Sequence, residues 1–225
     1  MADSAQGFGC TLNGHHPLAW ADVATTSFFP AKPLGCYGDG GAVMTNAAAL
    51  ADLIDSLRLY GKAMPADIAA RQFRHDPRYL NLRVGMNSRL DTIQAAILLE
   101  KLKIFPDEIE RRQAVADRYS AALRGKVARV PQLAEGARSV WAQYTIEHVD
   151  RDALQDHLKA EGIPTAVYYP VPLHQQDFAT NYPVAPGGLP NTEAAARHVI
   201  SLPMHPYLDT DSQDRIIDAV ASFHD

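Results

Sequence analysis

The sequence has few of the features that mark secreted, membrane-spanning or nucleic-acid-binding proteins. Only two of its 225 residues are cysteine, Cys10 and Cys36, which are too few for a disulfide framework. A cytoplasmic setting, where thiols stay reduced, fits better than a secreted one. No apolar run approaches the ~18 residues of a membrane span, and the first residues lack the basic and apolar segments of a signal peptide.

An excess of positive charge is also missing. The chain carries 21 basic and 26 acidic residues, for a formal net charge of −5. Because the lysines and arginines are scattered, no surface is predicted for binding nucleic acid or an anionic membrane. The hydrophobic content of 47% is that of a soluble globular protein.

Apolar spacing predicts strands that alternate with helices. Residues 23–29 and 42–45 have the pattern of strands, and the glycine-rich stretch 38–41 between them is typical of a turn. Asn46 is predicted to cap a helix that ends at Gly61. The sequence therefore opens with a strand, turn, strand and helix.

The middle of the chain is predicted to be a loop followed by a helix. Residues 62–84 contain two prolines and no clear period, which predicts a long loop. A helical pattern begins near Asp91 and reaches Gly125, with a break or a new first turn at Pro106. The rhythm changes near Gly125, which is the expected domain boundary.

Shorter elements follow this boundary. Residues 140–149 are predicted to be extended, Asp150 to cap a helix ending at Gly162, and residues 163–169 to form a strand. Residues 170–190 are rich in proline and glycine and are predicted to form a long loop. Strands alternating with helices predict an α/β fold.

Lys32 differs from the other lysines in its surroundings. Two phenylalanines and a proline precede it, and Pro33 and Leu34 lead from it into the glycine-rich turn. Removal from water favours the neutral amine, the nucleophilic form needed for a Schiff base. Taken alone, the pattern also fits a surface lysine whose stem covers apolar groups, which is the simpler interpretation. The remaining lysines are expected to be solvated surface charges: Lys62, Lys101, Lys103, Lys126 and Lys159.

Four segments carry a more specific pattern: TSFFPAKPLGCYGDGGA at 26–42, GMNSRLDTIQAA at 85–96, YYPVPLH at 168–174 and SLPMHPYL at 201–208. Together and in this order they resemble the DegT/DnrJ/EryC1/StrS family of sugar aminotransferases. The resemblance implies the C-terminal part of a fold-type I transferase dependent on pyridoxal 5'-phosphate. An incomplete large domain with a mainly parallel sheet would span residues 1–124, and a small α/β domain residues 125–225.

The resemblance also assigns the residues that would hold the cofactor. Lys32 matches the catalytic lysine that holds pyridoxal phosphate as a Schiff base, and Ser27 matches a hydroxyl that binds its phosphate. In ADSAQ at 2–6, Asp3 matches the carboxylate facing the pyridine nitrogen, and Gln6 a residue near the ring oxygen. Such a carboxylate keeps the pyridinium protonated, so the ring can act as an electron sink. The simple alternative for Asp3 is a frayed terminus.

Further residues are matched to a neighbouring subunit and to the substrate. Asn87 matches a residue that reaches the cofactor phosphate of the neighbouring subunit, which implies a homodimer with shared active sites; a helix N-cap is compatible with this role. Arg89 is expected to grip a substrate carboxylate, although a helix-surface arginine fits equally well. Tyr168, Tyr169 and His174 are expected to line the sugar site, although buried aromatic residues usually belong to the core.

Within the family, residues 28–37 and 201–208 are most similar to enzymes that aminate a UDP-linked 3-keto-2-acetamido uronic acid for bacterial surface polysaccharide, including lipopolysaccharide O-antigen. The implied reaction moves an amino group, with glutamate as donor, to the nucleotide-linked keto-sugar. A sugar dehydratase of the same fold is an alternative, but those relatives carry histidine at the position of Lys32. No metal, nucleic acid or membrane is expected as a partner.

Family members begin well before the equivalent of Asp3. Their additional part supplies strands, a helix N-terminus at the cofactor phosphate and an aromatic residue that stacks on the ring. The chain is therefore expected to be N-terminally truncated and to bind the cofactor poorly by itself. A non-catalytic remnant or a partner subunit is the alternative from another class of function.

Overall fold

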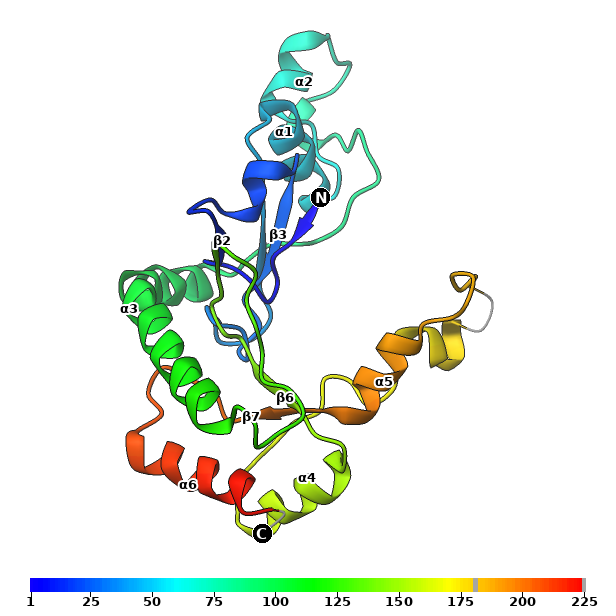
Figure 1. Ribbon diagram of the computed structural model, residues 1–225. Coiled ribbons are helices and arrows are strands. Elements are labelled where there is room, and N and C mark those ends of the chain that lie inside the picture. Colours follow the sequence, from blue (N-terminus) through cyan, green and yellow to red (C-terminus); the bar gives the residue numbers. More distant parts are fainter. Residues whose placement is uncertain (180–181, 224–225) are drawn as a thin grey trace. The chain divides into compact units, whose positions relative to one another are not determined.

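The computed structural model describes residues 1–179 and 182–223, which form two compact units (Figure 1). The first unit comprises Met1–Pro106 with Glu135–Val140, and the second comprises Asp107–Ala134 with Trp141–Asp225. None of the helices in the described residues is both long enough and apolar enough to cross a membrane.

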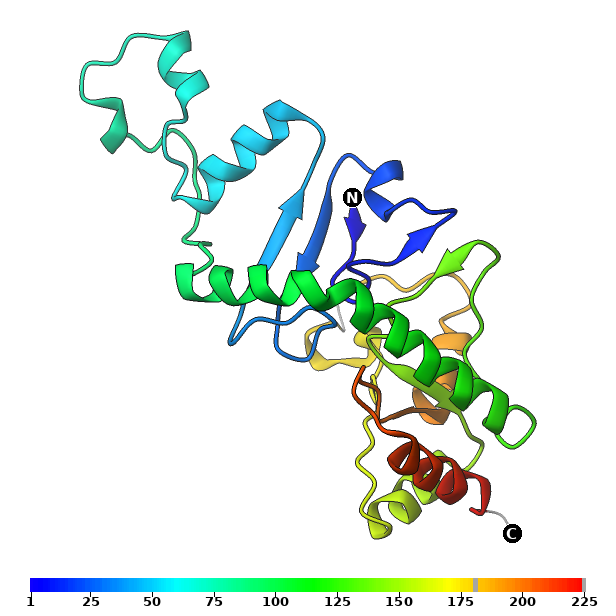
Figure 2. The same ribbon diagram turned by 90° about the vertical axis from the view of Figure 1, so that its left-hand side faces the viewer.

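The change from one unit to the other falls inside a helix. α3 (Thr92–Leu123), the long green helix in Figure 2, contains Pro106 in its interior. Phe105 and Ile109 are buried on either side of this proline. Because packing supplies most of a helix's stability, it outweighs the hydrogen bond that proline cannot donate. The predicted break at Pro106 is therefore wrong. The expected boundary between residues 124 and 125 remains a proposal about the domains of the complete protein.

Three strands form the main sheet of the first unit, in the order β1 (Ala2–Asp3), β3 (Ala24–Ser27), β4 (Gly41–Met44). β1 is parallel to β3, and β4 is antiparallel to it. The strand predicted at 23–29 is thus confirmed with shorter bounds, and the strand predicted at 42–45 is confirmed one residue earlier. The unit also contains an antiparallel ladder and a 3-10 helix: β2 (Thr11–Leu12) with β5 (Ala137–Arg138), and η1 (Pro17–Trp20).

The register of this sheet brings polar residues to one face. Asp3 pairs with Thr25 across the parallel ladder, and Ser27 lies two residues further along β3. Because side chains alternate along a strand, Asp3, Thr25 and Ser27 share one face. The opposite face of β3 is covered, since Ala24 is 0% and Thr26 is 7% exposed.

Helix α1 (Ala48–Arg58) follows β4. Its N-cap position is Ala47, whose side chain cannot cap, so the predicted cap at Asn46 is wrong. The Thr45 hydroxyl instead accepts a hydrogen bond from the Ala47 N–H at 3.1 Å, because a threonine can satisfy the backbone two residues further on. α1 ends at Arg58, three residues before the predicted helix end at Gly61. Gly61 follows with a φ of 75°, a conformation that glycine adopts without strain.

The segment after α1 is more ordered than expected. Residues 62–84, predicted to be a loop, contain α2 (Pro65–Ala70) and a 3-10 turn, η2 (Pro77–Tyr79). Asp67 accepts two hydrogen bonds of 2.8 Å from Arg83 and one of 3.0 Å from the Met64 N–H. The Arg83 guanidinium, and then this N–H, hold the pKa of the Asp67 carboxyl well below its ordinary value. This ion pair ties both ends of the segment together.

The second unit surrounds an antiparallel ladder of β6 (Tyr144–Glu147) and β7 (Val199–Leu202). The C-terminal part of α3 completes its core together with α4 (Arg151–Ala160) and α6 (Thr210–Ala221). A third helix, α5 (Pro190–His198), leads into β7. The core side chains of the two strands and of α3, α4 and α6 are fully buried or nearly so, among them Tyr119, Leu123, Tyr144, Leu154, Leu158, Ile200 and Ile217.

Three expectations for this unit need correction. Residues 163–169 form no strand, because Pro164 lacks a donor and only Ala166 is bridged to β7, through Ser201. Asp150 stands at the N-cap position of α4, but its side chain makes no capping hydrogen bond. The predicted loop at 170–190 contains two 3-10 turns, η3 (Leu173–Gln175) and η4 (Asp177–Ala179), while residues 180–181 lie outside the described residues.

Candidate active site

The Lys32 loop, residues 29–40, leaves the end of β3 and returns at the start of β4. Phe28 closes it through its backbone: its N–H donates to the Gly40 carbonyl and its carbonyl accepts from the Cys36 N–H, both at 2.7 Å. Within the loop, the Lys32 N–H donates to the carbonyl three residues earlier at 2.8 Å. Lys32 therefore lies on a closed loop.

The loop packs tightly on itself. Leu34 and Cys36 are 2% and 1% exposed. A methyl group on Gly35 would lie 2.7 Å from the Pro30 carbonyl oxygen and 2.9 Å from that of Phe29. Side chains do not approach backbone oxygens that closely, so only glycine fits this position. The shape of the loop thus depends on one residue without a side chain.

The Lys32 side chain is half-buried. Across the part of the chain that the structure describes, its ammonium has neither a hydrogen-bond nor an ion-pair partner. An amine without a partner is available to attack a carbonyl carbon once it is deprotonated. Half-burial is compatible with both interpretations of Lys32, so its catalytic role stays a prediction.

Two side chains of α3 bind the loop from outside, and neither is singled out by the sequence pattern. Gln94 Nε2 donates to the carbonyls of Tyr37 at 3.0 Å and Asp39 at 2.9 Å. Lys101 Nζ donates to the carbonyl of Gly35. Lys101 is half-buried, so its expected role as a solvated surface charge is wrong. The signal that would have found both is their spacing of seven residues, about two helical turns.

Asp3 and Ser27 lie at the carboxyl ends of two parallel strands. Asp3 is held in β1, and its Oδ1 accepts a hydrogen bond from the Ala5 N–H at 2.9 Å, so it does not belong to a frayed terminus. Ser27 Oγ accepts from the Phe29 N–H at 3.2 Å, which leaves its own O–H free to donate. Gln6 is exposed in the turn after β1. The structure thus brings Asp3 and Ser27 to one face.

Asn87 and Arg89 lie in an extended segment that runs beside the end of α1. Asn87 is bridged to Leu59, and α3 begins only at Thr92, so Asn87 is not a helix cap and Arg89 is not on a helix. The Arg89 guanidinium lies 5.8 Å from the ring centroid of Tyr60. Arg89 is therefore held in place by side chains of its own unit.

Two glycines let this segment approach α1. The backbones at Gly61 and Gly85 are so close that neither position has room for a methyl group: one would collide with Arg83 and the other with Leu57. This backbone crossing lies just before Asn87 and fixes the path of the chain at the start of the segment that carries Asn87 and Arg89.

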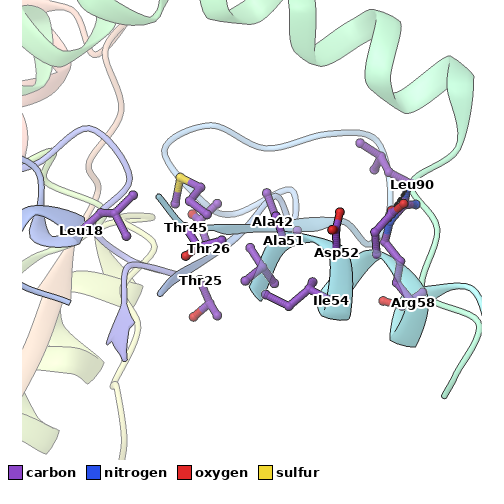
Figure 3. A pocket seen from close by; sticks show the side chains of 15 residues that line it. Leu18, Thr25, Thr26, Ala42, Thr45, Ala51, Asp52, Ile54, Arg58 and Leu90 are labelled. Atoms are coloured by element: carbon purple, nitrogen blue, oxygen red, sulfur yellow. Dashed lines mark hydrogen bonds and ion pairs between the residues drawn. The ribbon is translucent and has the colours of Figure 1, made fainter. Parts of the chain in front are cut away.

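A pocket of about 420 Å³ joins this segment to the glycine-rich turn. Its lining consists of residues from the two regions: Asp39, Gly40, Gly41, Asn87, Ser88, Arg89 and Leu90. A larger pocket of about 1020 Å³ lies beside it, between β4 and α1, and includes Ala42, Ala51 and Ile54 (Figure 3). The larger pocket contains neither Lys32 nor Asp3, so size alone would point away from the predicted chemistry.

In the second unit, Tyr168 and Tyr169 line a pocket of about 520 Å³ with Leu173. The two tyrosines are joined by a cis peptide bond, and they are 43% and 66% exposed, so they do not belong to the core. His174 is half-buried, with Nε2 3.1 Å from the Oε1 of Glu193 in α5. The structure therefore groups the two tyrosines but turns His174 toward a carboxylate.

Similarity to known proteins agrees with this architecture. Residues 1–221 match the DegT/DnrJ/EryC1/StrS aminotransferase family, to which the chain therefore belongs. The chain has the α/β fold of part of a pyridoxal-phosphate-dependent sugar aminotransferase.

Two curated relatives are nucleotide-sugar enzymes by name. The chain is 47% identical over 212 residues to the UDP-2-acetamido-2-deoxy-3-oxo-D-glucuronate aminotransferase of Pseudomonas aeruginosa, covering 94% of the chain and 55% of the relative. It is 38% identical to the dTDP-3-amino-3,4,6-trideoxy-alpha-D-glucose transaminase of Streptomyces venezuelae, covering 98% and 55%. The chain thus spans about half the length of the curated relatives it matches.

Solved structures give the same result. A DegT DnrJ EryC1 StrS aminotransferase from Brucella abortus superposes with a TM-score of 0.90 at 50% identity, covering 99% of this chain and 56% of the other. A structure from Bacillus subtilis with bound cofactor PMP has a TM-score of 0.78 at 28% identity, covering 98% and 49%.

Proposed function

We propose that this chain forms part of a pyridoxal-phosphate-dependent aminotransferase that transfers an amino group to a nucleotide-linked keto-sugar. The observation that carries the proposal is Lys32, a half-buried lysine without a partner among the described residues, on a closed loop at the end of β3. Membership of an aminotransferase family supports it. Asp3 and Ser27 share one face of the sheet that carries the loop.

The side chains present fit such a cofactor. Asp3 is exposed and uses one oxygen on a backbone N–H, so its second oxygen is free to face a protonated ring nitrogen. Ser27 accepts one hydrogen bond and keeps its hydroxyl proton for a phosphate oxygen. Lys32 can provide the amine. Donor, acceptor and nucleophile therefore match the three functional groups of pyridoxal phosphate.

When bound, pyridoxal phosphate supplies an aldehyde that exchanges amino groups and a ring that withdraws electrons from the reacting carbon. Lys32 Nζ would hold the aldehyde carbon and, once released, take and return a proton as general base and acid. Asp3 would keep the ring nitrogen protonated. Ser27, and Asn87 of a partner subunit, would donate hydrogen bonds to the phosphate.

For the substrate, we propose a UDP-linked 3-keto uronic acid, with glutamate as donor, in the synthesis of bacterial surface polysaccharide such as O-antigen. The 47% identity to a UDP-keto-glucuronate aminotransferase supports this choice. Arg89 would bind the sugar carboxylate, and Tyr168, Tyr169 and His174 would line the sugar site. The working protein would be a cytoplasmic homodimer. A dehydratase is disfavoured, because lysine occupies position 32.

The cofactor assignment is tested by chemical trapping. The complete protein is incubated with pyridoxal phosphate, reduced with borohydride and digested, and the labelled peptides are identified by mass spectrometry. We expect the label on Lys32 in preference to the other five lysines, and its loss in Lys32→Ala. A label on another lysine, or one spread evenly over all six, would refute the assignment.

A second candidate is a non-catalytic partner subunit of such an enzyme. The two functions are separated by supplying the uncovered part, taken from the Pseudomonas aeruginosa relative, as a fused N-terminal segment. An aminotransferase should convert the keto-sugar with glutamate in this form and lose all turnover in Lys32→Ala. An inactive fusion that folds and binds the cofactor would favour the partner subunit.

A further inference from the structure

The carbonyl groups of the Lys32 loop do not all find partners within the loop itself. Three of them, on Gly35, Tyr37 and Asp39, accept hydrogen bonds from side chains of α3. These carbonyls follow Lys32 along the chain. The backbone of Phe28, before Lys32, is bonded to Cys36 and Gly40 after it. Lys32 thus lies in a loop that is closed through Phe28 and attached to α3 through its second half.

The attachment uses a single face of α3. Gln94 and Lys101 are seven residues apart, so they point the same way along the helix. Leu98 lies between them on this face and is 5% exposed. Gln94 also donates to Cys36 Sγ at 3.4 Å. Its amide nitrogen thus contacts Cys36, Tyr37 and Asp39 in the second half of the loop. The face therefore presents a donor, an apolar contact and a second donor.

Lys101 behaves differently from its neighbour on the same helix. Lys103 forms an exposed ion pair with Glu100 at 2.7 Å. Lys101 has no carboxylate partner among the residues described, and its ammonium is directed at a backbone carbonyl. Charge balance alone does not explain this arrangement. The Gly35 carbonyl belongs to a residue at which a side chain would collide with the loop's own backbone.

We infer that Gln94 and Lys101 are positioning residues that hold the Lys32 loop in the shape needed for cofactor attachment. The inference rests on the proposed function of Lys32 as the cofactor lysine. Neither residue needs to touch the cofactor. By restricting the loop, both would hold the Lys32 amine near the carbon it attacks, and such restriction raises the rate of the step.

The test compares Gln94→Leu and Lys101→Met with Lys103→Met, a matched control two residues further along α3. Amide hydrogen exchange across residues 28–40 is measured first, without any cofactor. Each test variant should exchange roughly two- to tenfold faster there, as expected for the loss of one or two hydrogen bonds. The melting temperature and the exchange of β1 and β3 should stay close to those of the unchanged protein. Lys101→Arg keeps a donor and should restore protection.

Borohydride trapping with pyridoxal phosphate, carried out on the complete protein, is the second measurement. Gln94→Leu and Lys101→Met should label Lys32 several-fold more slowly, while Lys103→Met labels it at the original rate. Unchanged exchange and unchanged labelling in both variants would overturn the inference while leaving the cofactor proposal intact. A global loss of stability would also overturn it, because it would make both residues merely structural. If the unchanged protein never carries the label on Lys32, the proposed function fails, and altered exchange still reports the attachment.

Discussion

Arg89 Nε donates a hydrogen bond to the side-chain oxygen of Asn87 at 2.9 Å, and its terminal nitrogen lies 3.4 Å from the Tyr60 hydroxyl. Both contacts orient the guanidinium without neutralising it, because neither partner is an anion. The Asn87 oxygen is occupied by this bond, so its amide nitrogen is left as a donor. The pair therefore offers hydrogen-bond donors to an anionic group.

The first prediction concerns Arg89. Arg89→Lys keeps the charge but loses the planar fork that binds a carboxylate through two hydrogen bonds. In the complete enzyme, kcat/KM for a uronic-acid keto-sugar should fall by about tenfold or more, as a charge-assisted pair lost from a binding site predicts. The neutral counterpart of the sugar should lose much less. Tyr60→Phe, which removes only the long contact, serves as the control. Equal losses on both sugars would leave Arg89 without a role in reading the carboxylate.

The second prediction follows from sharing of the site between subunits. Complete Lys32→Ala and Asn87→Ala proteins, each nearly inactive, should regain activity when their subunits are exchanged. In a mixed dimer, one of the two sites receives both an intact Lys32 and an intact Asn87. Because random exchange of equal amounts makes about half of the dimers mixed, about a quarter of full activity is expected for the mixture. Subunit exchange is verified by mass spectrometry of differently tagged chains. Exchanged dimers that stay inactive would argue that each subunit builds its site alone.

The third prediction uses the ion pair of Asp67 and Arg83. The folded chain lowers the pKa of Asp67, so the pair stabilises the folded state above the ordinary aspartate pKa of about 3.9 and loses this effect as the pH falls below it. Limited proteolysis should therefore cleave residues 62–84 faster in acid. Asp67→Asn should show fast cleavage already at neutral pH and a flatter pH dependence. Asp55→Asn, which removes the ion pair of Asp55 with Arg58 inside α1, is the control and should leave the cleavage of residues 62–84 unchanged.

The fourth prediction concerns the outer edge of β4. Within the described residues, β4 pairs only with β3, and Val43 on it is 47% exposed. An unpaired edge with an apolar side chain invites pairing with other chains. Val43→Lys should lower the rate of aggregation measured by light scattering. Val149→Lys, at a position that is 67% exposed outside any strand, is the control. Equal effects of both substitutions would assign the aggregation to general surface charge.

The strands and helices with clear local signals could be predicted from the sequence. The strand before Lys32, the turn before Gly41 and the end of α1 depend on glycine and proline chemistry that acts over a few residues. Pro106 misled the prediction, because a local rule was outweighed by the packing of Phe105 and Ile109. Residues 163–169 misled it in the opposite direction, since apolar content without a partner strand does not make a strand.

In the candidate site too, residues with local sequence signals could be predicted, and residues whose contacts depend on the fold could not. Lys32, Ser27 and Asp3 are site residues predicted from motifs, and the shared face of the last two follows from strand alternation. Gln94 and Lys101 were missed because their partners are backbone carbonyls roughly sixty residues away, and carbonyls leave no trace in side-chain patterns. The contact of Arg89 with Tyr60 was missed for a related reason: it depends on the course of the chain between them.

The crossing of the backbones at Gly61 and Gly85 has a consequence for how this segment can evolve. Each glycine faces main-chain atoms and not a side chain that could shrink, so no change elsewhere makes room for a larger residue. A saturation library should therefore retain glycine alone at both positions, while exposed Val84 and Met86 next to the crossing accept many replacements. Substitutions near Asn87 are thus expected only at exposed side chains, and the path of the backbone stays the same in all of these variants.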